Sequence, residues 1–272
     1  MGSGAVSPRR STVAVALGCI AVSLALVAAY APGRVVSPAR AASASTSSIA
    51  VVGLGDSVTA GSNCDCRDFV YLYADIARAR TGRSIVVHNL GQGGLTAVEL
   101  LQQLRTDAEV QRRVSRARVV LVTIGANDQY PSLRQWQRAG CDRSCWGPRV
   151  DRLQSGIAAI VSRVQALRGG QRTLVMVTNY WNVFEDGDVA VTDYGSAFLS
   201  WSERLTRVAN TRICAGALAA GARCTDLYTP FKDADGGSDP TGLLADDGDH
   251  PNAAGHRVIA GALARTGLPW RG

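Results

Sequence analysis

Residues 118–128 read RVVLVTIGAND. The six residues after the leading arginine are apolar or β-branched, which is the composition of a strand buried on both faces of a parallel sheet. The four residues that follow, Gly125 to Asp128, are small or polar and mark the end of that strand. We therefore predict a central strand over residues 118–124 with polar side chains at its carboxyl end.

The same pattern recurs along the chain. Four further short apolar runs predict strands, at residues 48–54, 84–90, 173–178 and 223–227. Between the strands, apolar residues recur at helical spacing and predict helices over residues 69–80, 97–113, 150–167, 196–220 and 253–266. Strands that alternate with helices form a parallel sheet covered on both faces. The predicted fold class is therefore α/β, a single three-layer α/β/α domain with a five-stranded parallel sheet.

The start of the chain has the pattern of a targeting segment. Arg9 and Arg10 precede an apolar run over residues 13–31, and Ala39-Arg40-Ala41 offers the small residues of a cleavage site. An apolar run of about 19 residues is also long enough to cross a bilayer. We predict a cleaved signal peptide, with an uncleaved signal anchor as the alternative.

This reading divides the chain into three parts. Residues 1–41 are the signal peptide or signal anchor, residues 42–48 (ASASTSS) are a small polar linker, and residues 49–272 form the folded domain. We expect a secreted, extracellular protein. In the alternative, the N-terminal segment alone holds it to the membrane, with the domain outside the cytoplasm.

The net charge of +7 raises nucleic acid as a partner. Four arginines in the first 41 residues, which contain no acid, account for more than half of that charge. The rest of the chain has no block of basic residues and no basic segment interleaved with aromatic residues. We therefore expect no nucleic-acid partner.

Six cysteines follow the linker: Cys64, Cys66, Cys141, Cys145, Cys214 and Cys224. An even number of cysteines in an exported chain favours disulfides. Two of the close pairs also have the spacing of zinc ligands, an alternative that export disfavours. The spacing does not select one pairing, although we favour the local bonds Cys141–Cys145 and Cys214–Cys224. A Cys64–Cys66 bond would close an unusually tight ring, so cross-pairing stays open.

Small and polar residues stand at the carboxyl ends of the first three predicted strands, where open α/β sheets bind ligands. Gly55-Asp56-Ser57 follows the first strand, residues 89–94 (NLGQGG) follow the second, and residues 125–128 (GAND) follow the third. A fourth polar segment, residues 247–251 (DGDHP), comes just before the last helix. We expect these segments to meet at one edge of the sheet.

A serine becomes a strong nucleophile when a base takes its proton, and the chain has three histidines to serve. His88 lies inside a predicted strand and His256 inside the last helix, so both are interpreted as structural. His250 lies in a polar loop three residues after Asp247, a spacing that lets one turn present an imidazole and the carboxylate that orients it. The competing carboxylates are Asp246 and Asp249.

Ester hydrolysis also needs hydrogen-bond donors aimed at the oxyanion. The candidates are the Ser57 backbone N–H, a glycine N–H from the second loop and the Asn127 side-chain amide. Glycine suits the second loop because the backbone can approach a substrate closely without a Cβ. Each segment alone is ordinary turn chemistry, but the four together predict a serine hydrolase.

This combination resembles the SGNH hydrolases, also called the GDSL lipase/esterase family. Residues 55–57 match its first block, Asn89-x-Gly91-x-x-Gly94 its second, Gly125-x-Asn127-Asp128 its third and Asp247-x-x-His250 its last. The resemblance covers Ile49 to Thr266. Leu95 departs from the pattern, since many members carry a polar residue there.

The resemblance implies a flavodoxin-like SGNH hydrolase fold. It also implies Ser57 as the nucleophile, His250 as the base and Asp247 as the acid of a catalytic triad. The oxyanion hole would consist of the Ser57 N–H, the Gly94 N–H and the Asn127 amide, with no cofactor and no metal. The secretory signal, the six cysteines and the Cys141–Cys145 insertion resemble the exported bacterial branch of the family.

We accordingly expect a secreted serine esterase or lipase that acts as a monomer. Its substrate would be a small-molecule, lipid or acylated polysaccharide ester. The segments 130–148 and 180–194 are rich in aromatic side chains. These side chains either line an acyl groove or cover the crevice. One alternative keeps the fold but makes the protein an acyltransferase or a polysaccharide deacetylase, and a less favoured one is a non-catalytic surface binding module.

Overall fold

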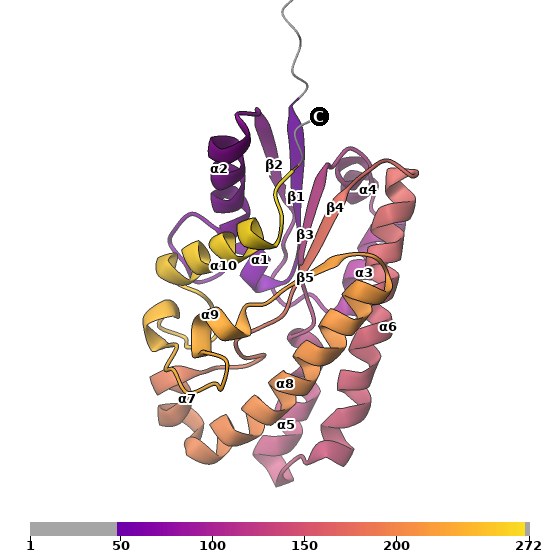
Figure 1. Ribbon diagram of the computed structural model, residues 1–272. Helices are drawn as coiled ribbons and strands as arrows, with labels where there is room; N and C mark the ends of the chain where they lie inside the picture. The colour runs from indigo at the N-terminus through magenta and orange to yellow at the C-terminus, as the bar shows by residue number, and fades with distance from the viewer. Residues whose placement is uncertain (1–47, 270–272) are drawn as a thin grey trace, which may run out of the picture. The chain divides into compact units, whose positions relative to one another are not determined.

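The computed structural model describes residues 48–269 (Figure 1). The predicted signal segment, and the linker except for its last residue, lie outside the described residues. Within residues 48–269, no helix combines the length and the apolar character needed to cross a membrane.

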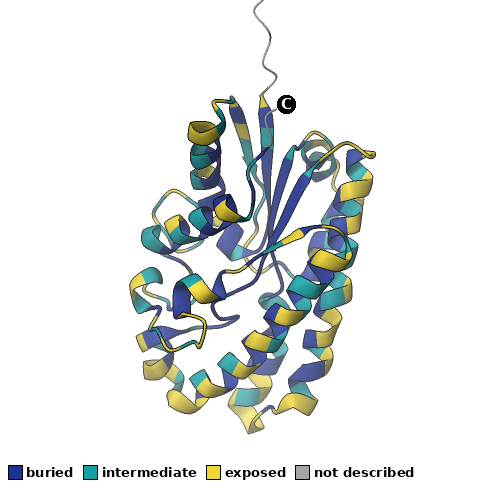
Figure 2. Cartoon of the chain, viewed as in Figure 1, coloured by how far each residue is buried: buried dark blue, intermediate teal, exposed yellow. Residues whose placement is uncertain are grey.

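The centre of the fold is a five-stranded parallel sheet, as the sequence predicts. Its strands are β1 (Ile49–Gly55), β2 (Ile85–Asn89), β3 (Val119–Thr123), β4 (Leu174–Thr178) and β5 (Arg223–Thr225). The order across the sheet is β2-β1-β3-β4-β5, with every neighbouring pair parallel. β3 and β4 are buried along their whole length, and Figure 2 shows the middle of the sheet as the most deeply covered part of the fold. This order is the flavodoxin-like one.

Helices cover both faces of the sheet, which makes the three predicted layers (Figure 1). On one face lie α2 (Phe69–Thr81) and α10 (Ala253–Thr266), which pack against each other. On the other face lie α3 (Ala97–Thr106), α6 (Arg143–Arg168) and α8 (Ser196–Ala219). The buried positions of these helices recur at helical spacing, as at Val150, Leu153, Ile157 and Ile160 of α6.

Two predicted helices differ from the structure by more than one residue at a boundary. The single helix expected over residues 97–113 is two helices, α3 and α4 (Ala108–Val114), because the chain turns at Asp107, which adopts an extended conformation. The Asp107 carboxylate then accepts the backbone N–H groups of Glu109 and Val110 and caps α4. α6 begins at Arg143 rather than residue 150, because Asp142 caps it and the helix continues through Pro148.

Several short helices were not predicted. They are α1 (Ser57–Ala60), α5 (Tyr130–Ala139), α7 (Gly187–Tyr194) and α9 (Tyr228–Lys232). All four follow the carboxyl end of a strand in the chain. Their shortness explains the omission, since an apolar period needs about 11 or more residues to be read.

The six cysteines of the domain form three local disulfides. They are Cys64–Cys66, Cys141–Cys145 and Cys214–Cys224, which include the two pairs favoured on sequence grounds. Cys214 lies on α8 and Cys224 on β5, so their bond ties the short edge strand to the helix that precedes it.

Aromatic residues form one packed cluster. Trp201 stacks on Trp136 and Phe184, with ring centroids 5.4 Å apart in both cases, and Phe198 contacts all three. Trp181 and Tyr180 are fully buried, whereas Tyr130 keeps 41% of its surface exposed. Most of these side chains are therefore buried against one another, whereas the exposed Tyr130 lines the same cavity as Ser57, together with Tyr180 and Trp181.

Candidate active site

Ser57 is the first residue of α1, directly after β1. Gly55 ends the strand at φ +140°, and a Cβ there would lie 1.9 Å from the carbonyl oxygen of Thr123, so the close approach of β1 to β3 requires glycine. Asp56 caps α1, since its carboxylate accepts the Val58 N–H at 3.1 Å. The sharp turn therefore holds Ser57 at the end of the strand.

Asp56 itself points away from solvent. It has 1% of its surface exposed and accepts a short hydrogen bond from the Tyr180 hydroxyl. Burial raises the pKa of Asp56 to about 7, although the Tyr180 hydroxyl and the Val58 N–H act in the opposite direction. The sequence leaves open whether Tyr180 lines an acyl groove or covers the crevice. In the structure its hydroxyl contacts Asp56, and its side chain lines the same cavity as Ser57.

The fourth segment brings Asp247 and His250 together. Nδ1 of His250 lies 2.6 Å from Oδ2 of Asp247, and Oδ1 of Asp247 accepts the backbone N–H groups of Asp249 and His250 at 3.0 Å each. Burial works to raise the pKa of Asp247, but these donors outweigh it and the pKa is lowered. Asp247 is thus the carboxylate that contacts the His250 ring.

The competing aspartates occupy different surroundings. Asp246 is exposed, whereas Asp249 turns inward and burial raises its pKa to about 6. Asp249 borders a cavity that is also lined by Ser57, Asn127 and Tyr130. The loop of residues 247–251 therefore presents one low-pKa carboxylate to the histidine and one high-pKa carboxylate to the cavity.

The second and third segments are tied to each other and to α1. Asn89 donates to the Thr59 carbonyl at 2.7 Å and accepts the Gly91 N–H at 3.0 Å. A Cβ at Gly91 would lie 2.4 Å from the Ala60 nitrogen, which explains the glycine in this block. The Asn127 amide donates to the Leu95 carbonyl at 3.0 Å, next to Gly94, whose φ is +79°.

These contacts bring Ser57, Asn127 and the loop of Gly94 to one edge of the sheet. Ser57 follows β1 and Asn127 follows β3, so the two straddle the point where the strand order reverses. Both line the cavity bordered by Asp249, and the Asn127 amide joins the loop of Gly94. The space where a Cβ of Gly94 would lie is empty out to 4 Å.

The other two histidines lie elsewhere. His88 is on the edge strand β2, with its Nε2 3.2 Å from Arg113. His256 is fully buried on α10, and its Nδ1 accepts the Phe69 N–H at 3.2 Å. Burial lowers the pKa of His256 to about 4, so the ring is neutral at neutral pH.

Among the described residues, one group has the composition of a metal site. Cys64, Cys66 and His256 offer ligand atoms that lie within 4.8 Å of one another. The two sulfurs are bonded to each other, so the group offers no thiolate, the form of cysteine that binds metal.

Sequence reasoning missed Asn63. Its side-chain amide donates a short hydrogen bond to Oδ2 of Asp247, the oxygen that also contacts His250. Its only sequence signal is its place between the GDS turn and a cysteine pair, which does not reveal a partner 184 residues away.

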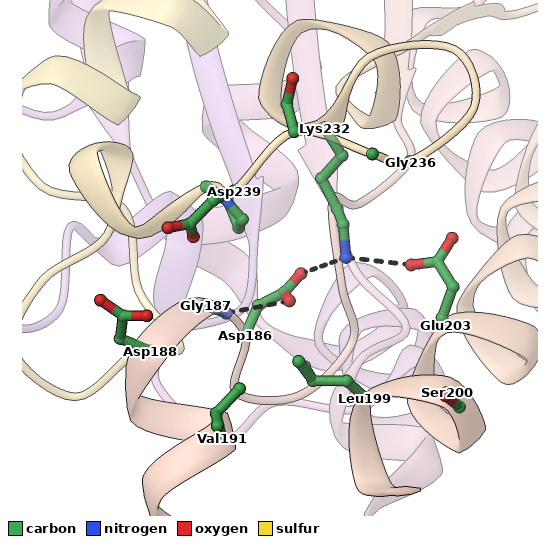
Figure 3. A pocket seen from close by; sticks show the side chains of 13 residues that line it. Asp186, Gly187, Asp188, Val191, Leu199, Ser200, Glu203, Lys232, Gly236 and Asp239 are labelled. Atoms are coloured by element: carbon green, nitrogen blue, oxygen red, sulfur yellow. Dashed lines mark hydrogen bonds and ion pairs between the residues drawn. The ribbon is translucent and has the colours of Figure 1, made fainter. Parts of the chain in front are cut away.

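A larger cavity of about 480 Å³ lies beside α7, α8 and α9. Figure 3 shows Lys232 pointing between Asp186 and Glu203, at 2.7 and 3.0 Å from their carboxylates. None of the residues predicted for catalysis lines this cavity. This cavity is connected to the loop of residues 247–251, because the Asp186 N–H donates to the Gly248 carbonyl at 2.8 Å.

Comparison with known proteins settles the family. The model of the GDSL-like lipase/acylhydrolase family matches residues 54–258, a span that contains all four sequence blocks. The chain belongs to the GDSL-like lipase/acylhydrolase family. As a GDSL hydrolase it is a carboxylic ester hydrolase, with the flavodoxin-like SGNH fold expected from its sequence.

Several solved structures have the same fold as this GDSL hydrolase. The lipase Lip_vut3 from a goat rumen metagenome has a TM-score of 0.68 at 19% identity, covering 81% of this chain and 98% of its own. Axe2, an acetylxylan esterase from Geobacillus stearothermophilus, has a TM-score of 0.54 at 19% identity, covering 81% of this chain and 94% of its own. LAE5, an alpha/beta hydrolase enzyme from the metagenome of Lake Arreo, has a TM-score of 0.55 at 21% identity, covering 83% of this chain and 99% of its own. No curated protein matches the chain.

Proposed function

We propose that this GDSL hydrolase is a secreted esterase in which Ser57 is the nucleophile, His250 the general base and Asp247 the carboxylate that orients the base. The observation that carries the proposal is the 2.6 Å contact between Asp247 Oδ2 and His250 Nδ1. A carboxylate that accepts from Nδ1 keeps the proton on that nitrogen and leaves Nε2 free to take a proton. The three disulfides are compatible with export.

The oxyanion hole in this proposal consists of the Ser57 N–H, the Gly94 N–H and the Asn127 amide. Asn127 uses one amide hydrogen on the Leu95 carbonyl, and its second hydrogen is the one proposed for the oxyanion. Ser57 and Asn127 line the same cavity, which supports their joint role. Loss of one such donor typically lowers the rate by about 10²- to 10³-fold.

The reaction would proceed in two halves. Ser57 Oγ attacks the ester carbonyl while its proton moves to Nε2 of His250. The tetrahedral intermediate collapses to an acyl-enzyme, and Nε2 returns the proton to the leaving alcohol. Water then attacks the acyl-enzyme by the same route, releasing the acid and restoring Ser57.

We propose short acyl groups, acetyl first, as the substrate class. The cavity that Ser57 and Asn127 line is small and is also lined by Trp181 and Val183, which favours a short acyl group at this position. Axe2, which shares the fold, acts on acetylated xylan according to its name. A long acyl chain would have to leave this cavity along the surface.

Hydrolysis of p-nitrophenyl esters from acetate to palmitate tests the proposal. We expect kcat/KM to be highest on acetate and Ser57→Ala to lower kcat by at least about 10⁴-fold on every ester. Ser155→Ala, a change of an exposed serine on α6, is the matched control and should keep wild-type rates.

Two results would overturn these assignments. Substantial turnover by Ser57→Ala, or labelling of that variant by a fluorophosphonate probe, would remove Ser57 as the nucleophile. A kcat/KM that rises toward palmitate would remove the short-acyl assignment. Adding an alcohol acceptor distinguishes hydrolysis from acyl transfer, since a transferase would form the new ester in preference to the free acid.

A further inference from the structure

Asn63 joins the nucleophile segment to the acid of the proposed triad. Its Nδ2 donates to Oδ2 of Asp247 and lies 3.3 Å from Nδ1 of His250. An ionised carboxylate only accepts hydrogen bonds, so the amide must present its NH₂ group and not its oxygen to Asp247. The His250 ring and the Asn63 amide therefore share one acceptor oxygen.

Hydrogen-bond donors therefore occupy both oxygens of the Asp247 carboxylate. Two backbone N–H groups of the catalytic loop occupy Oδ1, and His250 with Asn63 occupies Oδ2. The loop donors come from within two or three residues of Asp247 and move with it. Asn63 is the side-chain donor among the described residues that reaches Asp247 from elsewhere in the fold, and it fixes the carboxylate against the nucleophile turn.

The backbone around Asn63 is shaped for this contact. Asn63 has φ +57°, in the left-handed region, which asparagine tolerates better than most residues. Ser62 donates to the Ser57 carbonyl at 3.0 Å, and Cys64 donates to the Gly61 carbonyl at 3.4 Å. One short segment thus runs from the nucleophile to Asn63, with its backbone held at both ends.

The Cys64–Cys66 disulfide lies directly after Asn63. Its Cα atoms are 5.0 Å apart, and the Cys66 N–H donates to the Cys64 carbonyl at 2.5 Å. Both sulfurs lie within 4.8 Å of a ring nitrogen of His256, which is fully buried on α10. α10 begins three residues after His250, so the disulfide loop packs against the helix that follows the catalytic loop.

We infer that Asn63 is a positioning residue, held in place by the Cys64–Cys66 loop, that fixes the Asp247 carboxylate toward His250. This inference rests on the proposed triad and adds a residue outside it. Asn63 acts through Asp247 and does not touch the reacting atoms. Its loss should slow the chemical step while leaving substrate binding intact.

Asn63→Gly is the informative substitution, because glycine adopts the left-handed backbone freely and removes only the amide. We expect kcat to fall roughly tenfold, as for the loss of a hydrogen bond to a charged group, with KM within about twofold of wild type. The Tm should fall by a few degrees, because the folded state loses the same hydrogen bond, so the Tm does not distinguish a positioning role from a structural one. The downfield proton resonance of His250 Nδ1–H should shift, a signature that a purely structural role would not move.

The Cys64–Cys66 disulfide allows a second test of the inference. The double variant Cys64→Ser/Cys66→Ser should lower kcat in the same direction, because Asn63 loses its support. The matched control Cys141→Ser/Cys145→Ser breaks a disulfide at the start of α6 and should leave kcat unchanged.

The outcomes separate this inference from the proposed function. If Ser57→Ala abolishes turnover while Asn63→Gly keeps the wild-type kcat and resonance, the positioning role is wrong and the triad stands. If Ser57→Ala keeps its turnover, the proposed function fails first. A wild-type kcat in Cys64→Ser/Cys66→Ser would overturn the part assigned to the disulfide.

Discussion

At the scale of single residues, the site is built from carboxyl groups whose surroundings differ. Asp247 accepts four hydrogen bonds, and its pKa is lowered despite burial. Burial instead raises the pKa of Asp249 to about 6 and that of Asp56 to about 7. Environments that push carboxyl pKa values apart are typical of sites where the groups have different roles. Asp247 stays charged beside His250, while the buried Asp56 caps the helix that begins at Ser57.

Asp56 makes the stability of the protein depend on pH. Because its pKa rises from 3.8 to about 7 on folding, its contribution is fully present below pH 3.8 and is lost as the pH rises through 7. The loss is at most about 4 kcal/mol at 1.36 kcal/mol per pKa unit. Asp56→Asn, which keeps an N-cap side chain, should therefore gain stability relative to wild type between pH 5 and pH 8.

Urea unfolding at the two pH values measures this difference. The quantity to compare is the free energy of unfolding of Asp56→Asn minus that of wild type, since packing changes at the position cancel between the two pH values. An identical difference at pH 5 and pH 8 would show that Asp56 does not keep its proton in the folded state.

At the scale of elements, side-chain caps decide where helices begin. Asp107 lies between α3 and α4 and caps α4. Asp142 caps the start of α6, and Asn252 caps α10 just after the loop of residues 247–251. Each accepts two backbone N–H groups that the helix leaves unpaired. At residue 107 the cap prevails over an apolar pattern that continues across it, so the expected single helix is divided.

Removing the cap at Asp107 should cost about 1 kcal/mol of unfolding free energy. Asp107→Ala loses the acceptor, whereas Asp107→Asn keeps one and serves as the control. Equilibrium denaturation of the three proteins compares them, and kcat should be unchanged because α4 lies away from the site. Equal stability of the alanine and asparagine variants would mean that the cap does not hold α4.

At the scale of the whole described domain, a buried ion pair connects segments that are distant in the sequence. Lys232 of α9 lies between Asp186, before α7, and Glu203 of α8, with 7% of its side-chain surface exposed (Figure 3). The Tyr228 hydroxyl and Arg207 also contact Glu203. Because the Asp186 N–H donates to the Gly248 carbonyl, this cluster supports the loop of residues 247–251, which carries the proposed catalytic base.

Breaking the cluster should destabilise the protein strongly. Lys232→Met keeps the length of the side chain but leaves the Asp186 carboxylate buried without its cation, which typically costs about 3–5 kcal/mol. The control is Arg212→Met, which breaks the exposed pair with Asp151 and should cost less than about 1 kcal/mol. Thermal unfolding of both variants tests this expectation, and equal Tm values would contradict it.

The sequence by itself determined the fold class, the five strands and the four segments at the strand ends. These features are local: an apolar run predicts a buried strand, and a GDS turn or an Asp-x-x-His loop lies within a few residues of the chain. The last helix, α10, has the predicted bounds, residues 253–266, for the same reason, since its apolar period is continuous in the sequence.

Only the tertiary structure decided which side chains meet. It placed Asp247 rather than Asp249 against His250, and Tyr180 behind Asp56. It also brought Asn63 to a carboxylate 184 residues away. The physical reason is that a hydrogen bond acts over about 3 Å in space, whatever the separation along the chain. Its partners are therefore set by the packing of α2 and α10 and the turns beside them, which no local pattern encodes.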